Sequence, residues 1–327
     1  MISIIVPFNN EKYLERCLEN LKNIKYRDFE VVMINDFCNT DVVKIIKKYS
    51  TVLNIKYYKT RNKTIGVGNA RNLGIENASG NYIMFIDSDD SIDINLLNLL
   101  QPYIDKNIEM IKYKMNFIND KDQNIQDKGN IEIEQKYILK KITTGKKWFN
   151  KEYFKDKFLD SPCLYLIKKD FINKLNLKFE VNVFHEDFGL IPQLIVNANT
   201  FVDTEYSGYN YFQTDNSIIR NNDYLKKLKK VDDKIFLYEK LLKNLGKYNL
   251  DARTCENILI YYINSIIFSI GKLNYKDRIF YENLLKHKKV LKNLKCRNFK
   301  QYIKKLMLKY NMELYYKIKR GNCIVRK

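Results

Sequence analysis

The chain has 327 residues, with 58 Lys and Arg against 38 Asp and Glu, so its formal net charge is +20. That length allows one large core, or a catalytic domain of roughly 220 residues with an appendage, and we favour two lobes. The six cysteines occur singly and there are two histidines, a pattern that does not favour a zinc site or a disulfide framework. The positive charge has two interpretations that stay open: an anionic partner, or a composition rich in Lys, Asn, Ile and Tyr throughout.

At its amino terminus the chain has a short apolar run, Met1 to Pro7, with no charged segment before it. This run predicts a first strand and not a signal peptide. The longest apolar run, Ile258 to Ile270, contains polar residues and falls short of the ~20 residues that span a bilayer, so it predicts a buried helix. We therefore expect a cytoplasmic protein.

Residues 1 to about 100 alternate short apolar runs with helical patterns, which predicts βαβ units and a largely parallel sheet. The predicted strands are Ser3–Val6, Phe29–Ile34, Ile55–Tyr58 and Tyr82–Ile86. The predicted helices between them are a segment from Tyr13 to Leu21 with Asn9 and Asn10 as cap candidates, then Asp41–Tyr49 and Asn69–Asn77.

From about residue 109 the pattern changes to mixed strands and helices. These are the strands Met110–Phe117, Leu164–Ile167 and Tyr206–Phe212, the helices Trp148–Phe158 and Asp187–Ala198, and a polar loop, Asp120–Gly129. Lysine-rich amphipathic helical patterns follow from Asn222 to the end. We predict a catalytic domain over 1–221, with a nucleotide-sugar half (1–108) and an acceptor half (109–221), and a helical basic region over 222–327.

Acidic side chains follow two of the predicted parallel strands. Asp36 comes after the second strand, and the run Asp87-Ser-Asp-Asp90 comes after the fourth. Ligands of open α/β sheets bind at such strand ends, and adjacent carboxylates repel unless a cation such as Mg²⁺ or Mn²⁺, bound with substrate phosphates, neutralises them. The alternative is that Asp89, Asp90 and Ser91 cap a helix that begins near Ile94.

Five segments of the first ninety residues carry a resemblance to a known family. They are Ser3-Ile-Ile-Val-Pro-Phe-Asn9, Glu11-Lys-Tyr-Leu-Glu-Arg-Cys-Leu18, Phe29-Glu-Val-Val-Met-Ile-Asn-Asp36, Gly68-Asn-Ala-Arg-Asn-Leu-Gly74 and Gly80-Asn-Tyr-Ile-Met-Phe-Ile-Asp-Ser-Asp-Asp90. In this order they closely resemble the family 2 inverting glycosyltransferases of the GT-A fold. The resemblance implies an α/β fold with a nucleotide-binding, mostly parallel sheet flanked by helices, and here a helical carboxyl-terminal region.

The resemblance also implies roles for single residues on the donor side. The nucleotide-sugar would be bound by residues of the first, second and fourth strand ends and of the Ala-Arg-Asn helix, namely Pro7, Phe8, Asn9, Asp36, Arg71, Asp87, Ser88 and Asp89. Asp87 and Asp89 would hold Mn²⁺ or Mg²⁺ with the diphosphate. For Arg71 the alternative is a surface arginine on a helix.

On the acceptor side, Phe184-His-Glu-Asp-Phe188 resembles the family's Glu-Asp element, which makes Asp187 the catalytic base. Glu186 and His185 would then lie near the acceptor, although the same acids also suit the first turn of a helix. The segment from Tyr209 resembles the family's Tyr-x-Tyr element, which implies a lid formed by Gln213, Ser217 and Arg220.

Two segments depart from the family pattern, and one competing motif can be dismissed. After Asp36 the family's glycine is missing and one residue is inserted, and Pro162-Cys-Leu-Tyr-Leu-Ile167 replaces the usual Trp-Asn-Lys-Leu-Tyr, which predicts a changed acceptor wall. Gly66-Val-Gly68-Asn-Ala-Arg71 begins like a dinucleotide fingerprint, but its third glycine position is Arg71 and no strand leads into it.

These patterns predict an inverting transferase that moves a hexose or N-acetylhexosamine from a nucleotide-sugar, by resemblance a UDP-sugar, to a hydroxyl of a bacterial surface glycan. Lipid-linked glycans are among the expected acceptors, and nucleic acid is not an expected partner. The basic carboxyl-terminal helices have two open interpretations, peripheral contact with the anionic inner membrane face or a solvated surface. The alternatives in function are a nucleotidyltransferase of similar fold and a noncatalytic polyanion-binding protein.

Overall fold

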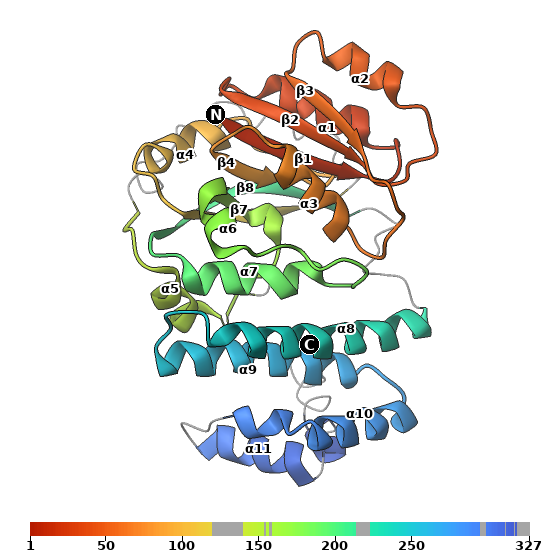
Figure 1. The fold of residues 1–327 in the computed structure, drawn as a ribbon, viewed down its shortest axis with the longest axis vertical. Helices are drawn as coiled ribbons and strands as arrows, with labels where there is room; N and C mark the ends of the chain where they lie inside the picture. Colours follow the sequence, from red (N-terminus) through yellow and green to blue (C-terminus); the bar gives the residue numbers. More distant parts are fainter. Residues whose placement is uncertain are drawn as a thin grey trace. The chain divides into compact units, whose positions relative to one another are not determined.

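The computed structural model describes residues 1–119, 140–153, 155–156, 159–213, 223–294, 299–310, 312–316 and 318. Within these residues, eight strands form one sheet in the order β3-β2-β1-β4-β7-β6-β8-β5 (Figure 1). The strands are β1 (Ile2–Phe8), β2 (Phe29–Asn35), β3 (Ile55–Lys59), β4 (Tyr82–Phe85), β5 (Ser91–Ile92), β6 (Met110–Asn119), β7 (Tyr165–Lys168) and β8 (Phe201–Gln213).

The strands β3, β2, β1 and β4 are parallel to one another. The chain runs outward from β1 to β2 and β3, then returns past β1 to form β4, so the direction of winding reverses between β1 and β4. A reversal of this kind opens a crevice outside the carboxyl ends of the two strands, and ligands of α/β proteins bind there. The topology therefore selects the ends of β1 and β4 as the place for a site.

Helices flank this parallel part of the sheet (Figure 1). The helices along residues 1–213 are α1 (Leu14–Asn23), α2 (Val43–Tyr49), α3 (Gly68–Asn77), α4 (Leu96–Ile104), α5 (Gly145–Glu152), α6 (Lys169–Leu175) and α7 (Glu186–Asn197), with a 3-10 turn η3 (Pro162–Leu164). Right-handed crossovers place α1 and α2 on one face and α3 on the other. A Cβ atom at Gly74 of α3 would collide with the side chain of Ile5, so α3 approaches β1 closely because that residue is a glycine.

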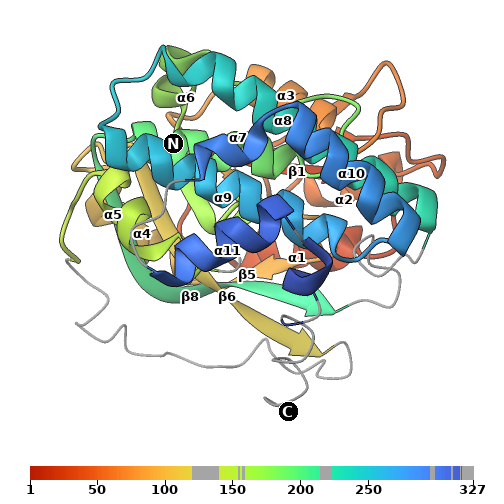
Figure 2. The same cartoon turned by 90° about the horizontal axis from the view of Figure 1, so that it is seen from below.

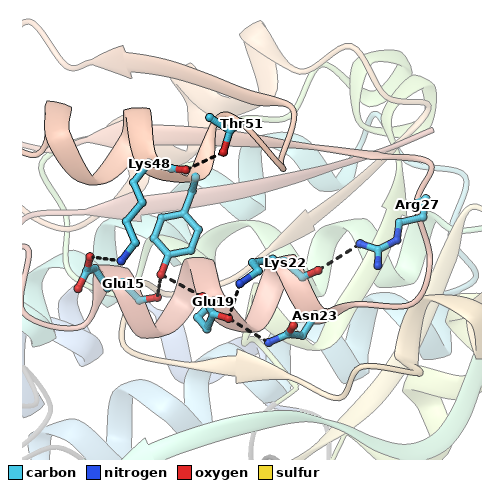
Figure 3. A network of polar contacts seen from close by, with 8 residues as sticks. Glu15, Glu19, Lys22, Asn23, Arg27, Lys48 and Thr51 are labelled. Carbon is cyan, nitrogen blue, oxygen red and sulfur yellow. Dashed lines mark hydrogen bonds and ion pairs between the residues drawn. The ribbon is translucent and has the colours of Figure 1, made fainter.

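A polar network joins α1 and α2 on their shared face (Figure 3). The Lys48 ammonium of α2 lies 3.1 Å from a carboxylate oxygen of Glu15, and the Tyr49 hydroxyl donates to Glu19 over 3.2 Å. Within α1, Lys22 pairs with Glu19 at 2.8 Å. The aliphatic face of α1 is buried below this network, which matches its predicted apolar positions.

The structure corrects two expectations in the first hundred residues. Helix α1 begins at Leu14 and neither asparagine caps it, because Asn10 Oδ1 accepts from the backbone N–H of Lys12 in a turn before the helix. The helix expected near Ile94 is α4, which begins at Leu96, and Asp89, Asp90 and Ser91 do not cap it. Residues 91–92 instead form β5, whose Ile92 exchanges hydrogen bonds with Asn20 of α1.

The second half of the sheet is mixed, as the sequence pattern predicts. Strand β7 pairs antiparallel with β4 and β6, while β6 and β8 run parallel with an irregular register. The helix expected over Trp148–Phe158 is shifted, because α5 begins at Gly145, whose N–H donates to the Ala198 carbonyl over 2.8 Å. The polar loop Asp120–Gly129 lies outside the described residues.

The chain divides into two compact units, one made of residues 1–151 and 157–221 and the other of residues 152–156 and 222–327. The second unit is helical and can be followed in Figures 1 and 2. Its elements are α8 (Tyr224–Leu245), α9 (Ala252–Ile270), α10 (Tyr275–His287), the 3-10 turn η5 (Val290–Asn293) and α11 (Phe299–Tyr310). Lys234 of α8 donates to the hydroxyls of Ser265 and Ser269 on α9, so these two helices pack against each other.

Among the described residues, none of the helices combines the length and the apolar composition needed to cross a bilayer. The apolar run Ile258–Ile270 forms the second half of α9, and most of its aliphatic side chains are buried, as predicted.

A buried carboxylate ties together the starts of β1, β2 and β4. Glu30 accepts from the Ser3 hydroxyl over 2.6 Å and pairs with the Lys56 ammonium over 2.8 Å, and Gly80 N–H donates to the same Ser3 hydroxyl. Burial alone would raise the pKa of Glu30, but the hydrogen bonds from Lys56, Ser3 and Ser79 outweigh it and lower that pKa. The ionised carboxylate therefore stabilises the folded chain.

Replacement of this carboxylate by an amide, Glu30→Gln, should lower the free energy of unfolding by about 1–3 kcal/mol at neutral pH, because a charged acceptor is lost. A lowered native pKa contributes stability that is present above the unfolded value of about 4.3 and is lost as the pH falls further. Urea unfolding at pH 7, 5 and 3 measures the free energy of unfolding of the wild type and of Glu30→Gln. The difference between the two values should become smaller at pH 3. An unchanged difference from pH 7 to pH 3 would contradict the stabilising role of the ionised Glu30 carboxylate.

Candidate functional site

The carboxyl ends of β2, β1 and β4 lie side by side. Phe8 pairs with Asn35 in the ladder, and the N–H of Asp36 donates to the Phe8 carbonyl over 2.7 Å. On the other side of β1, the N–H of Ile86 donates to Ile5, so Asp87 follows directly at the neighbouring strand end. The predicted residues of the first, second and fourth strand ends are thus brought together by the sheet.

Asp36 sits in a partly closed environment beside β3. The hydroxyl of Thr60 donates to its carboxylate over 3.0 Å, and burial raises the pKa of Asp36. The next residue, Phe37, has a left-handed backbone with φ of 63°. In place of the family's glycine, this chain therefore puts a bulky residue in a conformation that glycine adopts at little cost.

Asp90 is a buried anchor at the end of the acidic run and is 1% exposed. It accepts from the Tyr209 hydroxyl over 2.6 Å and from the Phe212 N–H over 2.9 Å, both on β8. Burial, with the nearby Asp87 and Asp89, raises the pKa of Asp90 to about 8. The helix-cap alternative is wrong, because α4 has no side-chain cap and Asp90 bonds to β8 instead.

Two further contacts hold the backbone of the acidic run. The N–H of Asp87 donates to the Tyr209 hydroxyl over 3.3 Å, and the guanidinium of Arg16 on α1 donates to the Asp89 carbonyl. Arg16 also stacks 3.8 Å from the ring centroid of Phe212. The turn between β4 and β5 is therefore held from both α1 and β8, which leaves the half-exposed Asp87 and Asp89 side chains at the crevice.

Arg71 lies under this turn and is 5% exposed. One of its terminal nitrogens lies 3.2 Å from Asp87 Oδ1, and the other lies 2.6 Å from Glu186 Oε1. The alternative of a surface arginine is therefore wrong. The guanidinium joins the acidic run after β4 to the start of α7, although Glu186 is far along the chain.

Helix α7 presents both acids of the predicted Glu-Asp element in its first turn. His185 precedes them with a left-handed backbone, φ of 63°, and makes no side-chain cap. Glu186 is 6% exposed, and burial raises its pKa while the neighbouring Arg71 opposes that rise. Asp187 is half-buried and its Oδ1 accepts from the Phe188 N–H over 2.7 Å, so it combines a helix-start position with access to solvent.

The two glycines of the rejected dinucleotide pattern have a structural reason. Gly66 has φ of 74°, and a Cβ atom there would collide with the Val183 carbonyl oxygen. A Cβ atom at Gly68 would likewise collide with the Glu180 carbonyl oxygen and approach Glu186. Both glycines let the start of α3 approach the segment before α7, which is how Arg71 reaches Glu186.

The donor set for a divalent cation consists of the two half-exposed carboxylates Asp87 and Asp89. No cluster of three or more His, Cys, Asp or Glu that could hold a metal occurs among the described residues. Mg²⁺ is ordinarily held by one or two carboxylates completed by substrate phosphates and water, so two carboxylates at a crevice fit that chemistry. Arg71 pairs with Asp87 Oδ1, so this carboxylate also has a contact within the protein.

The structure leaves some predicted residues of the site undescribed and adds others that were not predicted. Ser217, Arg220 and the side chain of Gln213 lie outside the described residues, so the lid stays a prediction. Three residues of the site were not predicted: Arg16, Thr60 and Tyr209. Arg16 and Tyr209 lie inside segments that carry the family resemblance, which was the available signal.

Residues 3–172 match the family described as "Glycosyl transferase family 2". The chain belongs to this family. The resemblance inferred from the sequence is therefore confirmed for more than half of the chain.

Individual relatives are bacterial glycosyltransferases. Poly(ribitol-phosphate) beta-N-acetylglucosaminyltransferase TarS of Staphylococcus aureus is 34% identical over 122 residues, which are 36% of this chain and 21% of TarS. The chain thus matches only about a fifth of that relative's length. TarP, of the same described activity in S. aureus, is 25% identical over 297 residues, 86% of each chain.

Solved structures show the fold. The crystal structure of S. aureus TarS 1–349 in complex with UDP-GlcNAc matches with a TM-score of 0.68 at 18% identity, covering 90% of this chain and 81% of that one. A Pyrobaculum calidifontis mannosyltransferase in complex with GDP-Man and Mn²⁺ matches with a TM-score of 0.52 at 13% identity, covering 97% and 86%. The predicted fold class is confirmed.

Removal of one hydroxyl, Tyr209→Phe, should loosen the acidic run, because Asp90 loses a donor and the Asp87 N–H loses its acceptor. We expect a loss of about 1–3 kcal/mol in the free energy of unfolding. Hydrogen exchange of residues 86–90 should also become faster than in the wild-type protein. Tyr211→Phe on the same strand is the control, and equal exchange in both variants would refute the anchoring role.

Proposed function

We propose that this chain is an inverting glycosyltransferase that transfers a sugar from a UDP-sugar to a hydroxyl of a bacterial surface glycan. The observation that carries the proposal is the convergence, around buried Arg71, of the acidic run after β4 and the Glu-Asp element of α7. Metal-diphosphate and acceptor chemistry need these two groups at one crevice. Membership of family 2 supports the same conclusion and disfavours both alternatives, nucleotidyl transfer and noncatalytic polyanion binding.

The donor would bind across the ends of the parallel strands. Pro7 and Phe8 end β1 and Asn9 follows it, and these three residues would line the base and ribose. The Asp36 carboxylate would accept from the base. The sugar diphosphate would extend over Ser88 toward Asp89. The described activities of TarS and TarP favour N-acetylglucosamine as the sugar and a polymeric acceptor.

The reaction would be a single displacement at the anomeric carbon. A Mn²⁺ or Mg²⁺ ion bound by Asp89 and Asp87 would neutralise charge on the departing diphosphate. Asp187 would accept the proton of the attacking acceptor hydroxyl, since it is the half-exposed acid of the Glu-Asp element. His185 precedes it and is proposed as an acceptor contact, and Gln213, Ser217 and Arg220 as the lid.

A screen of nucleotide-sugars tests this function without knowledge of the acceptor. With Mn²⁺ or Mg²⁺ present, UDP-GlcNAc or another UDP-sugar should raise the unfolding temperature, because a ligand that binds the folded state stabilises it. Chelation of the metal should remove the effect. Slow hydrolysis should release UDP, whereas release of pyrophosphate would identify a nucleotidyltransferase.

Two variants assign the roles within that experiment. Asp187→Asn should lower transfer or hydrolysis by about 10²–10⁴-fold, because general-base assistance is lost, yet keep the thermal stabilisation by UDP-sugar and metal. Asp89→Asn should lose that metal-dependent stabilisation. Full transfer by Asp187→Asn would refute the base assignment, and stabilisation by no nucleotide-sugar would refute the function.

For the helical unit we propose peripheral contact with an anionic membrane surface. Lys226 and Lys230 lie one turn apart on α8, and burial together with Lys272 and Lys226 lowers the pKa of Lys230. Near them Phe268 is 64% exposed, and the Lys272 ammonium lies 4.3 Å from its ring centroid. Clustered cations beside an exposed aromatic ring suit a headgroup layer of negative charge.

Sedimentation with vesicles tests this contact. The full chain should bind vesicles rich in phosphatidylglycerol at low salt and leave them as the salt rises, because each nearby cation contributes about 1 kcal/mol. Lys226→Glu with Lys230→Glu should weaken binding, while the control pair Lys44→Glu with Lys47→Glu on α2 should not. Equal binding to neutral vesicles would contradict the proposal.

A further inference from the structure

We infer that Arg71 is a positioning residue: its buried guanidinium sets the geometry between the metal-side carboxylate Asp87 and the base-side helix that begins at Glu186. The inference rests on the proposed function for the roles of these two sides. Its structural basis is the pair of contacts, 3.2 Å to Asp87 Oδ1 and 2.6 Å to Glu186 Oε1, made by different terminal nitrogens.

The surroundings of Arg71 leave the guanidinium little contact with any ligand. Its carbon centre lies 5.5 Å from the ring centroid of Phe179 and 6.0 Å from that of Phe85, and these two rings pack edge to face. The Nε atom is buried and has no hydrogen-bond partner among the described residues. Among the described residues, the hydrogen bonds of the guanidinium therefore come from its two terminal nitrogens and go to carboxylates.

Glu186 has a corresponding arrangement. Its side chain turns into the protein toward Arg71, while the adjacent Asp187 stays half-buried at the crevice. Two neighbouring acids of one helical turn thus have different tasks, one to pair with the guanidinium and one to face the reactants. The ion pair that Glu186 makes is with Arg71.

The single positive charge of Arg71 is also shared between two acids, Asp87 and Glu186. Besides Asp87 and Glu186, the acid whose charge acts on Arg71 is Asp187. If Glu186 loses its charge, Arg71 neutralises Asp87 more completely, and Asp87 becomes a poorer partner for a cation. Loss of the Glu186 charge on α7 should therefore weaken metal-dependent nucleotide binding at Asp87.

Glu186→Gln tests this coupling with UDP and Mn²⁺ as probes in equilibrium titrations of the full chain. We expect the apparent affinity for UDP in the presence of Mn²⁺ to fall by about 5-fold to 150-fold, the usual range for coupling between sites. Glu313→Gln is the matched control, because Glu313 pairs with the buried Arg278 at 3.0 Å in the other unit. The control should bind UDP and Mn²⁺ as the wild type does.

Arg71→Lys adds a conservative variant. Lysine keeps the charge but has one ammonium in place of two separate nitrogens, so it should not restore both contacts. Its affinity for UDP with Mn²⁺ should fall as in Glu186→Gln. Wild-type affinity in Arg71→Lys would overturn the positioning role.

A ligand-free measurement keeps the inference separate from the proposed function. Thermal unfolding of Asp87→Asn, Glu186→Gln and the double variant should show non-additive losses. The double variant should lose more than the sum of the single losses, because only then does Arg71 keep neither of its paired carboxylates.

The outcomes can be told apart. Additive thermal losses, or wild-type affinity of Glu186→Gln for UDP with Mn²⁺, would overturn the inference. If the wild-type protein binds no nucleotide, the proposed function fails. Non-additive losses in thermal unfolding would then still show that Arg71 links Asp87 and Glu186, but that link would have no role in positioning substrates.

Discussion

A buried guanidinium needs negative partners, because an ion taken out of water without them costs several kcal/mol. Arg71 satisfies this requirement with carboxylates from two segments, the turn after β4 and the first turn of α7. The need for both partners explains other features of the region. Gly66 and Gly68 permit the start of α3 to approach the segment before α7, and His185 takes a left-handed backbone where that helix begins.

A second set of contacts fixes the same turn from the opposite direction. Tyr209 on β8 bonds to both ends of the acidic run, through the Asp87 N–H and the Asp90 carboxylate. Because β8 belongs to the mixed half of the sheet, the half of the sheet after residue 109 determines the geometry of the half before it. The acidic run is therefore held between two parts of the fold, and its half-exposed side chains do not depend on a flexible loop for their position.

Much of this fold could be predicted because the information is local. The parallel strands are continuous apolar runs, and the acids of the site follow them directly, so Asp36 and Asp87 were found by position alone. The family resemblance supplied Asp187. Pairings between distant residues could not be predicted: nothing near Arg71 indicates Glu186, and nothing in the acidic run distinguishes buried Asp90 from exposed Asp87. Helix starts were wrong where a tertiary contact sets them, as at Gly145.

The division of labour among the acids follows from burial. Asp90 and Glu186 are enclosed and have protein partners, so each serves to hold a segment in place. Asp89 and Asp187 are the half-exposed neighbours of those two acids, one residue away in each case. A one-residue step along the chain thus pairs each of these two anchored carboxylates with one that can meet a ligand. Because the anchor fixes the backbone, its neighbour can be positioned accurately without itself being buried, which a proposed metal ligand and a proposed base both require.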